Sequence, residues 1–411
     1  MFVRIINSLI PFSLIPIMTI YLSPSDYGIT VTFTAFTSIL AVFVHLSLSA
    51  AVNVNYFKIS REDIKTYIAN VILIVTFLAV IMCVFVYLFR DILSRKLEIP
   101  FIWLFIGVLF VFMQFFSLVN LGLWQTEQRS KPFAVYQIGQ MFFSIALVLT
   151  LVVGFDMGWE GKLIAQTFTA IGFSLIAIWF LYQRNYLNFK VEKKYILDAL
   201  KFGAPLIPHA LSSWFKFGVD RVLLTTLISS SATGLYAVGF QFGFIVGIVG
   251  LAFNQAFSPY LYKKLKNISY KDKKKLVQWT YLYFVGILLL ASLVSFIMPY
   301  IVKYFLDARY LLAIEYIPWI AFGYAFQGMY LMVVNYIFFT KKTYVLSLLT
   351  FSTGVTHMLL SYLLIKEYGA IGAAQATTLS FLITFVLVWV WSAKVYPMPW
   401  LFPNDTTKET L

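Results

Sequence analysis

The chain has 411 residues, of which 61% are apolar and only 12% are charged. A soluble domain is roughly 45–50% apolar and about 25% charged, and no soluble fold of this size could bury so much apolar surface. The formal net charge of +14 fits basic loops that meet anionic lipids at a membrane surface, and it gives no argument for nucleic acid. The composition therefore predicts an all-α integral membrane protein whose solvent is the lipid bilayer.

Apolar stretches of bilayer-spanning length recur along the chain, and each is bounded by charged or turn-forming residues. In chain order they are 2–22, 28–56, 67–89, 101–124, 133–154, 160–182, 203–228, 234–261, 277–305, 313–339, 344–365 and 369–393. Because a transmembrane helix needs about 20 apolar residues, these stretches predict about twelve transmembrane helices. The first stretch has no small-residue cleavage pattern, so it is interpreted as a span and not as a signal peptide.

The basic residues are divided unequally between the two sides of this arrangement. Most of the 31 lysines and arginines lie in loops on the side of the two termini. The loops on the opposite side carry Arg90, Arg95, Lys96, Lys162, Lys303, Arg309 and Lys366. Cytoplasmic loops are rich in Lys and Arg, so the asymmetry predicts that both termini are cytoplasmic. Lys216 and Arg221 are the two basic residues left inside a predicted span.

The turn after the first predicted span is repeated after the seventh. Residues 23–28 read Ser-Pro-Ser-Asp-Tyr-Gly, and residues 229–234 read Ser-Ser-Ser-Ala-Thr-Gly. Two halves with an even number of helices have the same topology and are related by an axis along the membrane normal. We therefore predict a six-helix lobe at 1–200, a second at 201–396, a short cytoplasmic tail at 397–411 and a substrate cleft between the lobes.

The seventh predicted span carries polar side chains that fall within roughly 40° of one another on a helical wheel. They are His209, Ser213, Lys216 and Asp220. A charge near the bilayer centre costs roughly 2.5–3.5 kcal/mol on insertion scales, and it is tolerated where it faces water or a partner. One interpretation is a water-filled cavity lined by this face. The alternative is a static ion pair between Asp220 and Lys216, with Arg221 directed outward.

Further polar residues in the spans leave function and packing open. The second predicted span has a stripe at helical spacing, consisting of Thr34, Ser38, His45, Ser49 and Asn53. The stripe either faces the same cavity or packs against other helices. Within it, His45 either relays protons or makes a packing hydrogen bond. Amides such as Gln241, Asn254 and Gln255 suit a cavity for hydroxyl-rich ligands, because an amide both donates and accepts hydrogen bonds.

No pattern in the sequence predicts a metal or nucleotide site. Cys83 is the single cysteine, and the three histidines are scattered along the chain, so neither a metal site nor a disulfide is expected. A phosphate-binding loop is absent from the sequence. We therefore expect no cofactor and no nucleotide.

Four blocks of sequence resemble one family of bacterial membrane proteins. They are Leu22–Ile29, Phe202–His209 followed by Asp220 and Arg221, Thr233–Tyr236, and Phe253–Tyr260 followed by Lys263 and Lys264. Together these blocks resemble the Wzx-type polysaccharide repeat-unit flippases of the multidrug/oligosaccharidyl-lipid/polysaccharide exporter superfamily. The resemblance implies a V-shaped fold of two lobes in the bacterial cytoplasmic membrane.

The resemblance also implies an activity, which is transport and not catalysis. Such a flippase moves an undecaprenyl-pyrophosphate-linked oligosaccharide from the cytoplasmic to the periplasmic leaflet for O-antigen, capsule or exopolysaccharide assembly. The expected partners are this lipid-linked substrate, membrane lipids and a polysaccharide polymerase with other assembly proteins.

The cationic cavity of that family implies roles for individual residues. Lys216 and Arg221 are the candidates for binding the pyrophosphate, and Arg4 is a third. Residues expected to contact sugar or to line the route are His209, Ser213, Gln241, Asn254 and Gln255. Asp220 is the candidate for proton coupling, or else it is held ionised by its basic neighbours.

Two other classes of protein stay open at this point. A cation-coupled drug antiporter of the same fold would need acidic residues in its cavity, whereas the charges of Lys216, Arg221 and Asp220 sum to a net positive charge. A membrane enzyme acting on polyprenyl-linked sugars would bring a catalytic cluster on a sizeable loop, and no predicted outer loop is long enough to carry one.

Overall fold

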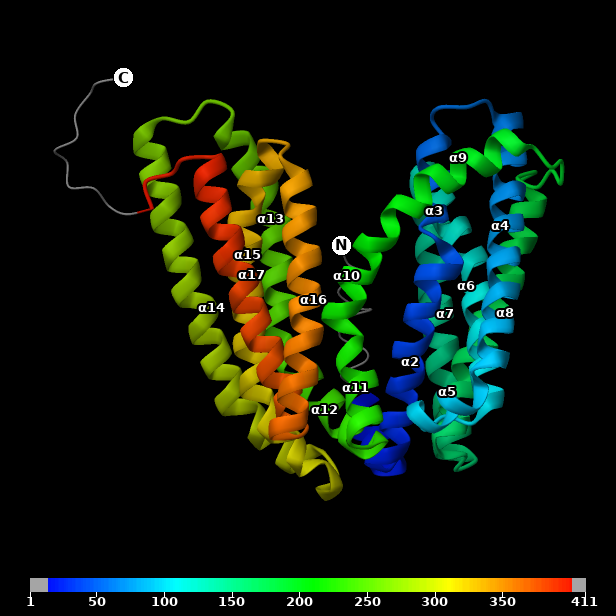
Figure 1. Cartoon of the computed structure of the whole chain (residues 1–411), viewed down its shortest axis with the longest axis horizontal. Coiled ribbons are helices and arrows are strands. Elements are labelled where there is room, and N and C mark those ends of the chain that lie inside the picture. The colour runs from blue at the N-terminus through cyan, green and yellow to red at the C-terminus, as the bar shows by residue number, and fades with distance from the viewer. Residues whose placement is uncertain (1–13, 401–411) are drawn as a thin grey trace. The chain divides into compact units, whose positions relative to one another are not determined.

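The computed structural model describes residues 14–400, which form helices and no strand (Figure 1). The chain divides into two compact units, residues 1–234 and 235–411. The lobes predicted from helix counting have their boundary at 200/201, so the contact-based division differs from them. Residues 201–234 pack within the first unit.

The first unit is built around α6, which contacts α2, α3, α4, α5, α7 and α8. Its elements are α2 (Pro24–His45), α3 (Leu48–Asn55), α4 (Arg61–Leu88), α5 (Arg90–Leu97), α6 (Phe101–Thr126), α7 (Ser130–Val148) continued by the π-helix η1 (Leu149–Gly154), α8 (Gly158–Gln183), α9 (Lys193–Gly203), the 3₁₀ turn η2 (Ala204–Leu206), α10 (Ile207–Phe217) and α11 (Val219–Leu227). Helix α12 (Ser230–Gly243) begins in this unit and continues into the second.

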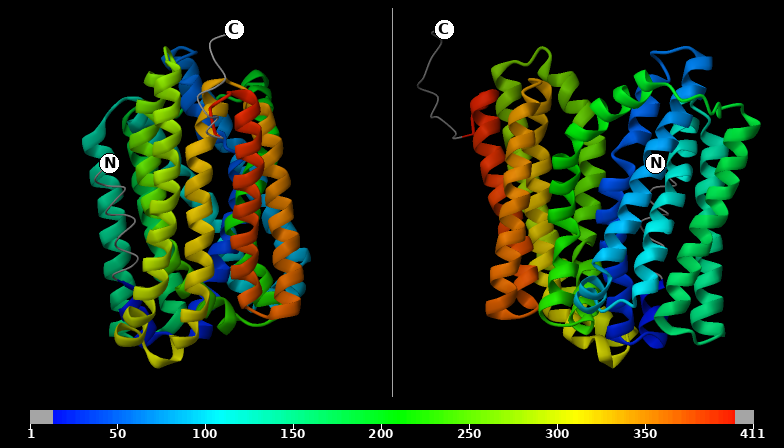
Figure 2. Two further views of the ribbon diagram at one scale, coloured as in Figure 1. Left: turned by 90° about the vertical axis from the view of Figure 1, so that its left-hand side faces the viewer. Right: turned by 45° about the vertical axis from the view of Figure 1, so that its right-hand side comes forward.

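The second unit is built around α15, which packs against α13, α14 and α17. Its elements are α13 (Ile245–Leu265), α14 (Tyr270–Phe305), the 3₁₀ segment η3 (Ala308–Tyr316), α15 (Ile317–Phe339), α16 (Thr343–Tyr368) and α17 (Ile371–Val395). Figure 2 shows these helices, coloured yellow-green to red, running side by side for most of their length.

Nine helices within residues 14–400 are long and apolar enough to cross a membrane. The pair α12 and α13, bent by 41°, would make a tenth. The predicted first span, 2–22, lies mostly outside the described residues. The predicted seventh span, 203–228, is broken into short helices because Pro205 and Pro208 interrupt backbone hydrogen bonding and Gly218 separates α10 from α11. The exact count of twelve therefore stays a prediction.

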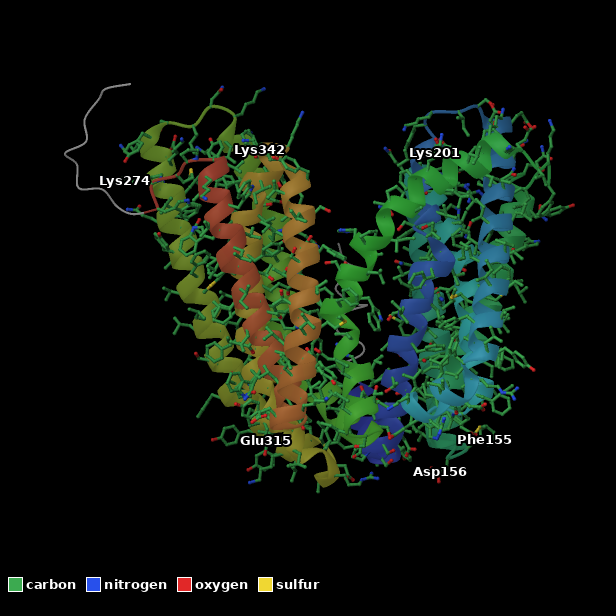
Figure 3. The ribbon with its side chains drawn as sticks, viewed as in Figure 1. Phe155, Asp156, Lys201, Lys274, Glu315 and Lys342 are labelled. Atoms are coloured by element: carbon green, nitrogen blue, oxygen red, sulfur yellow. The ribbon has the colours of Figure 1, made fainter. Side chains whose placement is uncertain are left out.

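Each unit has a lysine-rich end. In the first unit Lys201 lies at the end opposite Phe155 and Asp156, and in the second Lys274 and Lys342 lie opposite Glu315 (Figure 3). This agrees with the alternation of basic loops along the chain. The cytoplasmic placement of these ends stays a prediction.

The two copies of the repeated turn touch one another at the starts of α2 and α12. Helix α2 begins with a capping box in which the Ser23 side chain accepts from the Asp26 backbone N–H. A Cβ on Gly28 would lie 1.7 Å from the Ser230 carbonyl oxygen, and a Cβ on Gly234 would lie 1.9 Å from that of Pro24. In the repeat Gly28 corresponds to Gly234 and Pro24 to Ser230, so the contact is reciprocal. This geometry supports the internal repeat.

The segment before α9 is held to α4 by one buried amide. Asn70 is 1% exposed. Its Nδ2 donates to the Lys190 carbonyl oxygen at 2.8 Å, and its Oδ1 accepts from the Glu192 N–H at 2.9 Å. Asn70 thus replaces the hydrogen bonds that a neighbouring strand would supply, and it fixes the path of the chain into α9 and α10.

Replacing Asn70 by alanine is expected to lower the free energy of unfolding by about 2 kcal/mol, because the Lys190 carbonyl and the Glu192 N–H both lose their partner. Residues 185–192 should also become sensitive to protease. Thermal unfolding and limited proteolysis of the purified protein measure both effects. Thr76→Ala, an exposed position on the same helix, is the control. Equal stability and equal cleavage in the Asn70 variant would contradict this assignment.

Candidate functional site

Helix α10 is fixed against α2 by a single tryptophan. The Trp214 indole Nε1 donates to the Ala35 carbonyl oxygen at 3.0 Å. A Cβ on Gly218 would lie 2.6 Å from the same Nε1, so the indole needs glycine at that position. Trp214 thereby sets the height and rotation of α10, the helix that carries most of the predicted site residues.

Lys216 lies half-buried near the end of α10, where burial strongly desolvates its ammonium. It makes no hydrogen bond and no ion pair with any residue from 14 to 400. Ser213 lies one turn earlier and His209 two turns earlier, and both are exposed, with the Ser213 hydroxyl 3.4 Å from the His209 carbonyl oxygen. These three residues form the polar face that the sequence predicted.

Asp220 does not belong to that face. The helix breaks at Gly218, and Asp220 lies on α11, where its side chain is 1% exposed. No ion pair between Asp220 and Lys216 is found among the described residues, where burial is the one influence on the Lys216 ammonium. Arg221 is half-buried, and its Nη1 donates to the Phe217 carbonyl oxygen.

The predicted stripe on the second span is partly exposed and partly structural. Thr34 and Ser38 are exposed on α2. His45 is buried, and its Nε2 lies 2.8 Å from the Val111 carbonyl oxygen, with the ring 5.5 Å from that of Phe115. These contacts tie α2 to α6 and favour the packing role for His45.

The predicted amides lie in the second unit or on the helix that leads into it. Gln241 is half-buried on α12, and Gln255 is exposed on α13. Asn254 accepts from Asn335 Nδ2 at 2.8 Å, and Asn335 in turn accepts from the Tyr262 hydroxyl at 3.0 Å. Asn254 therefore joins α13 to α15. Arg4 lies outside the described residues, so its predicted role is untested.

Lys162 is enclosed by protein atoms, unlike a loop residue. Lys162 was counted with a loop, but it lies in α8, and burial strongly desolvates its ammonium. Its Nζ donates to the Thr30 hydroxyl at 3.0 Å and lies 4.3 Å from the centre of the Tyr27 ring. The predicted span 160–182 already contained this position, which is the signal that could have placed Lys162 inside the helix bundle.

Within residues 14–400 no group of three or more His, Cys, Asp or Glu side chains is arranged to hold a metal ion. Apart from the buried carboxylate of Asp220, the polar groups described above are ammonium, guanidinium, hydroxyl, imidazole and amide groups. Such a set suits the binding of an anionic, hydroxyl-rich ligand.

Comparison with solved structures identifies the fold. The chain matches an inward-facing multidrug resistance MATE family transporter of the MOP superfamily with a TM-score of 0.77 and 13% identity, over 94% of both chains. It matches the lipid II flippase MurJ in an inward closed conformation with a TM-score of 0.70 and 17% identity, over 96% of this chain and 86% of the other. This chain therefore shares its fold with those two proteins, and together with the bilayer-length helices the matches define a multi-pass membrane protein.

Comparison with protein sequences identifies the family. Residues 1–265 match the model of the polysaccharide biosynthesis protein family. Two relatives from Haemophilus influenzae are an uncharacterized membrane protein, 25% identical with 81% of each chain covered, and Lsg locus putative protein 1, 24% identical with 83% of each chain covered. The chain belongs to the polysaccharide biosynthesis protein family, as the sequence blocks predicted.

Proposed function

We propose that this protein is a flippase that moves undecaprenyl-pyrophosphate-linked oligosaccharide repeat units from the cytoplasmic to the outer leaflet for surface polysaccharide assembly. The family, and a fold shared with a lipid II flippase, support this class of transport. The observation that carries the proposal is Lys216, a desolvated cation with no partner among the described residues, on a helix face with two exposed polar side chains.

The chemistry of such a substrate matches these side chains. A lipid pyrophosphate carries dense negative charge, and charge-assisted hydrogen bonds from Lys216 and Arg221 would bind it, with Arg4 as a third cation. His209 and Ser213 would contact sugar hydroxyls. The polyprenyl tail stays in the lipid. In this proposal the lysine-rich ends and both termini lie in the cytoplasm of a bacterium, and a polymerase receives the product outside.

The two alternatives fit the side chains less well. A drug antiporter of the same fold needs a carboxylate that a cationic substrate can reach, and Asp220 is 1% exposed. An enzyme acting on polyprenyl-linked sugars needs a cluster of catalytic acids, bases or nucleophiles. The described face of α10 offers one histidine and one serine, whose hydroxyl approaches a backbone carbonyl.

The function is tested in a strain that lacks the protein. Full-length lipid-linked repeat units are expected to accumulate on the cytoplasmic leaflet, where lectins added outside spheroplasts cannot reach them, and the wild-type gene should restore access. Normal arrival at the outer leaflet would contradict the proposal. Accumulation of incomplete repeat units would instead support an enzyme.

A further inference from the structure

We propose that Lys162, Thr30 and Tyr27 form a second anion site in the first unit, which takes a diphosphate. This inference rests on the proposed function, because the diphosphate would be that of the lipid-linked substrate near the end of its passage. The site is separate from the α10 face, and the sequence patterns gave no sign of it.

The ammonium of Lys162 is incompletely satisfied. Of its three N–H donors, one is used on the Thr30 hydroxyl at 3.0 Å. The Thr30 hydroxyl gives its own proton to the Tyr27 carbonyl oxygen at 2.7 Å, so it presents a lone pair to Lys162. The Tyr27 ring covers one side of the ammonium at 4.3 Å. Lys162 makes no ion pair with any residue from 14 to 400, so a positive charge stands here without an anion.

A purely structural role explains this arrangement poorly. A hydroxyl and an aromatic ring stabilise a cation but do not neutralise it. A neutral side chain of similar length could join α8 to α2 without the cost of desolvating a charge. The charge itself is therefore the feature that needs a partner, and an anionic ligand supplies one.

Polar side chains continue from the site along α2 and α8. Lys162 keeps some accessible surface, although protein atoms crowd its ammonium. Thr34 and Ser38 lie one and two turns beyond Thr30 on α2 and are exposed, and Gln166 lies one turn beyond Lys162 on α8 and is half-buried. Hydroxyl and amide groups of this kind bind phosphate oxygens and sugar hydroxyls.

The position of Lys162 places it late on the proposed route. Helix α8 begins at Gly158, shortly after Phe155 and Asp156, which lie at the end of the first unit opposite Lys201 (Figure 3). Helices α8 and α10, which carry Lys162 and Lys216, both pack against α2. A diphosphate that enters at the lysine-rich end would meet Lys216 first and Lys162 last.

The binding test uses the purified full-length protein with farnesyl diphosphate as the lipid probe, inorganic pyrophosphate as the free anion and farnesol as the uncharged lipid. Lys162→Met is expected to weaken the binding of farnesyl diphosphate about tenfold or more, and Lys162→Arg should bind nearly as well as the wild type. The matched control is Lys366→Met, which removes an exposed lysine 4.4 Å from the centre of the Tyr362 ring. A folded Lys162→Met protein with unchanged binding overturns the site.

A second measurement needs no variant and so does not depend on folding. Farnesyl diphosphate should protect Lys162 of the wild-type protein from an amine-acylating reagent, as read by mass spectrometry, while farnesol should not, and Lys366 should label equally throughout. Equal labelling of Lys162 in all conditions overturns the site. Protection by farnesyl diphosphate at concentrations where inorganic pyrophosphate has no effect identifies the lipid as the source, and equal protection identifies free diphosphate.

The two proposals fail in distinguishable ways. Diphosphate binding that is weakened about tenfold or more in Lys162→Met supports the site even if the deletion strain shows no trapped repeat units. Repeat units trapped in the deletion strain, together with unchanged diphosphate binding in Lys162→Met, overturn the site and leave the flippase standing.

Discussion

Gly28→Ala is expected to lower the free energy of unfolding by about 3 kcal/mol, which is the upper range for an overpacked site. The added Cβ would meet the Ser230 carbonyl oxygen at 1.7 Å. A backbone oxygen cannot move away by a change of rotamer, as a flexible side chain can. The starts of α2 and α12 must therefore separate. Separation would also strain the Ser25–Ser230 hydroxyl contact, which is 2.9 Å long.

The effect is measured by thermal unfolding of the purified protein and by its steady-state level in membranes. Gly286→Ala on α14 is the matched control, because nothing lies within 4 Å of the added Cβ and alanine favours a helix by up to about 1 kcal/mol. Gly234→Ala should resemble Gly28→Ala, since the two glycines make equivalent contacts. If the Gly28 variant were as stable as the Gly286 variant, the tight crossing of α2 and α12 would be refuted.

Lys216→Met is expected to reduce export of the repeat unit about 30-fold at equal protein level. The estimate assumes the loss of one charge-assisted hydrogen bond worth about 2 kcal/mol to the pyrophosphate. Lys216→Arg keeps the charge and should retain most of the export. The rate at which repeat units become accessible to lectin on the outer leaflet measures the effect.

Lys201→Met is the control for this experiment, because it removes an exposed lysine at the lysine-rich end of the same unit. It should leave export within about twofold, since an exposed charge in water contributes little. Arg221→Met is a further arm that tests the second cation. Normal export in both Lys216→Met and Arg221→Met would rule out pyrophosphate binding by these cations.

The residues of the candidate site differ in how well the sequence predicted them. His209, Ser213 and Lys216 share one face, as the helical periodicity predicted, because all three lie within α10. Asp220 left that face because the helix breaks at Gly218, where the Trp214 indole occupies the space that a Cβ would need. The spacing of polar residues predicts a shared face only where the helix is unbroken. The spacing carries no information about a side chain such as the Trp214 indole that packs at the break.

For His45 and Lys162, too, the sequence did not predict the surroundings of the side chain. For His45 the sequence left a proton relay and a packing hydrogen bond open, and the contact of its Nε2 with the Val111 carbonyl oxygen favours packing. Lys162 was counted with a loop because charged residues mark the ends of the predicted spans. Its ammonium instead donates to the Thr30 hydroxyl and packs against the Tyr27 ring inside the helix bundle. In each case a residue more than 60 positions away in the sequence decided the role.

The sequence by itself determined that this is a helical membrane protein of the polysaccharide biosynthesis family, with a repeated glycine turn at Gly28 and Gly234. Composition and span length suffice for the class, because in lipid each helix satisfies its own backbone hydrogen bonds. Only the tertiary structure decided which polar side chains stay accessible and which make hydrogen bonds between packed helices. That depends on partners such as Ala35, Val111 and Thr30, which come from distant parts of the chain and are brought within hydrogen-bonding distance by helix packing.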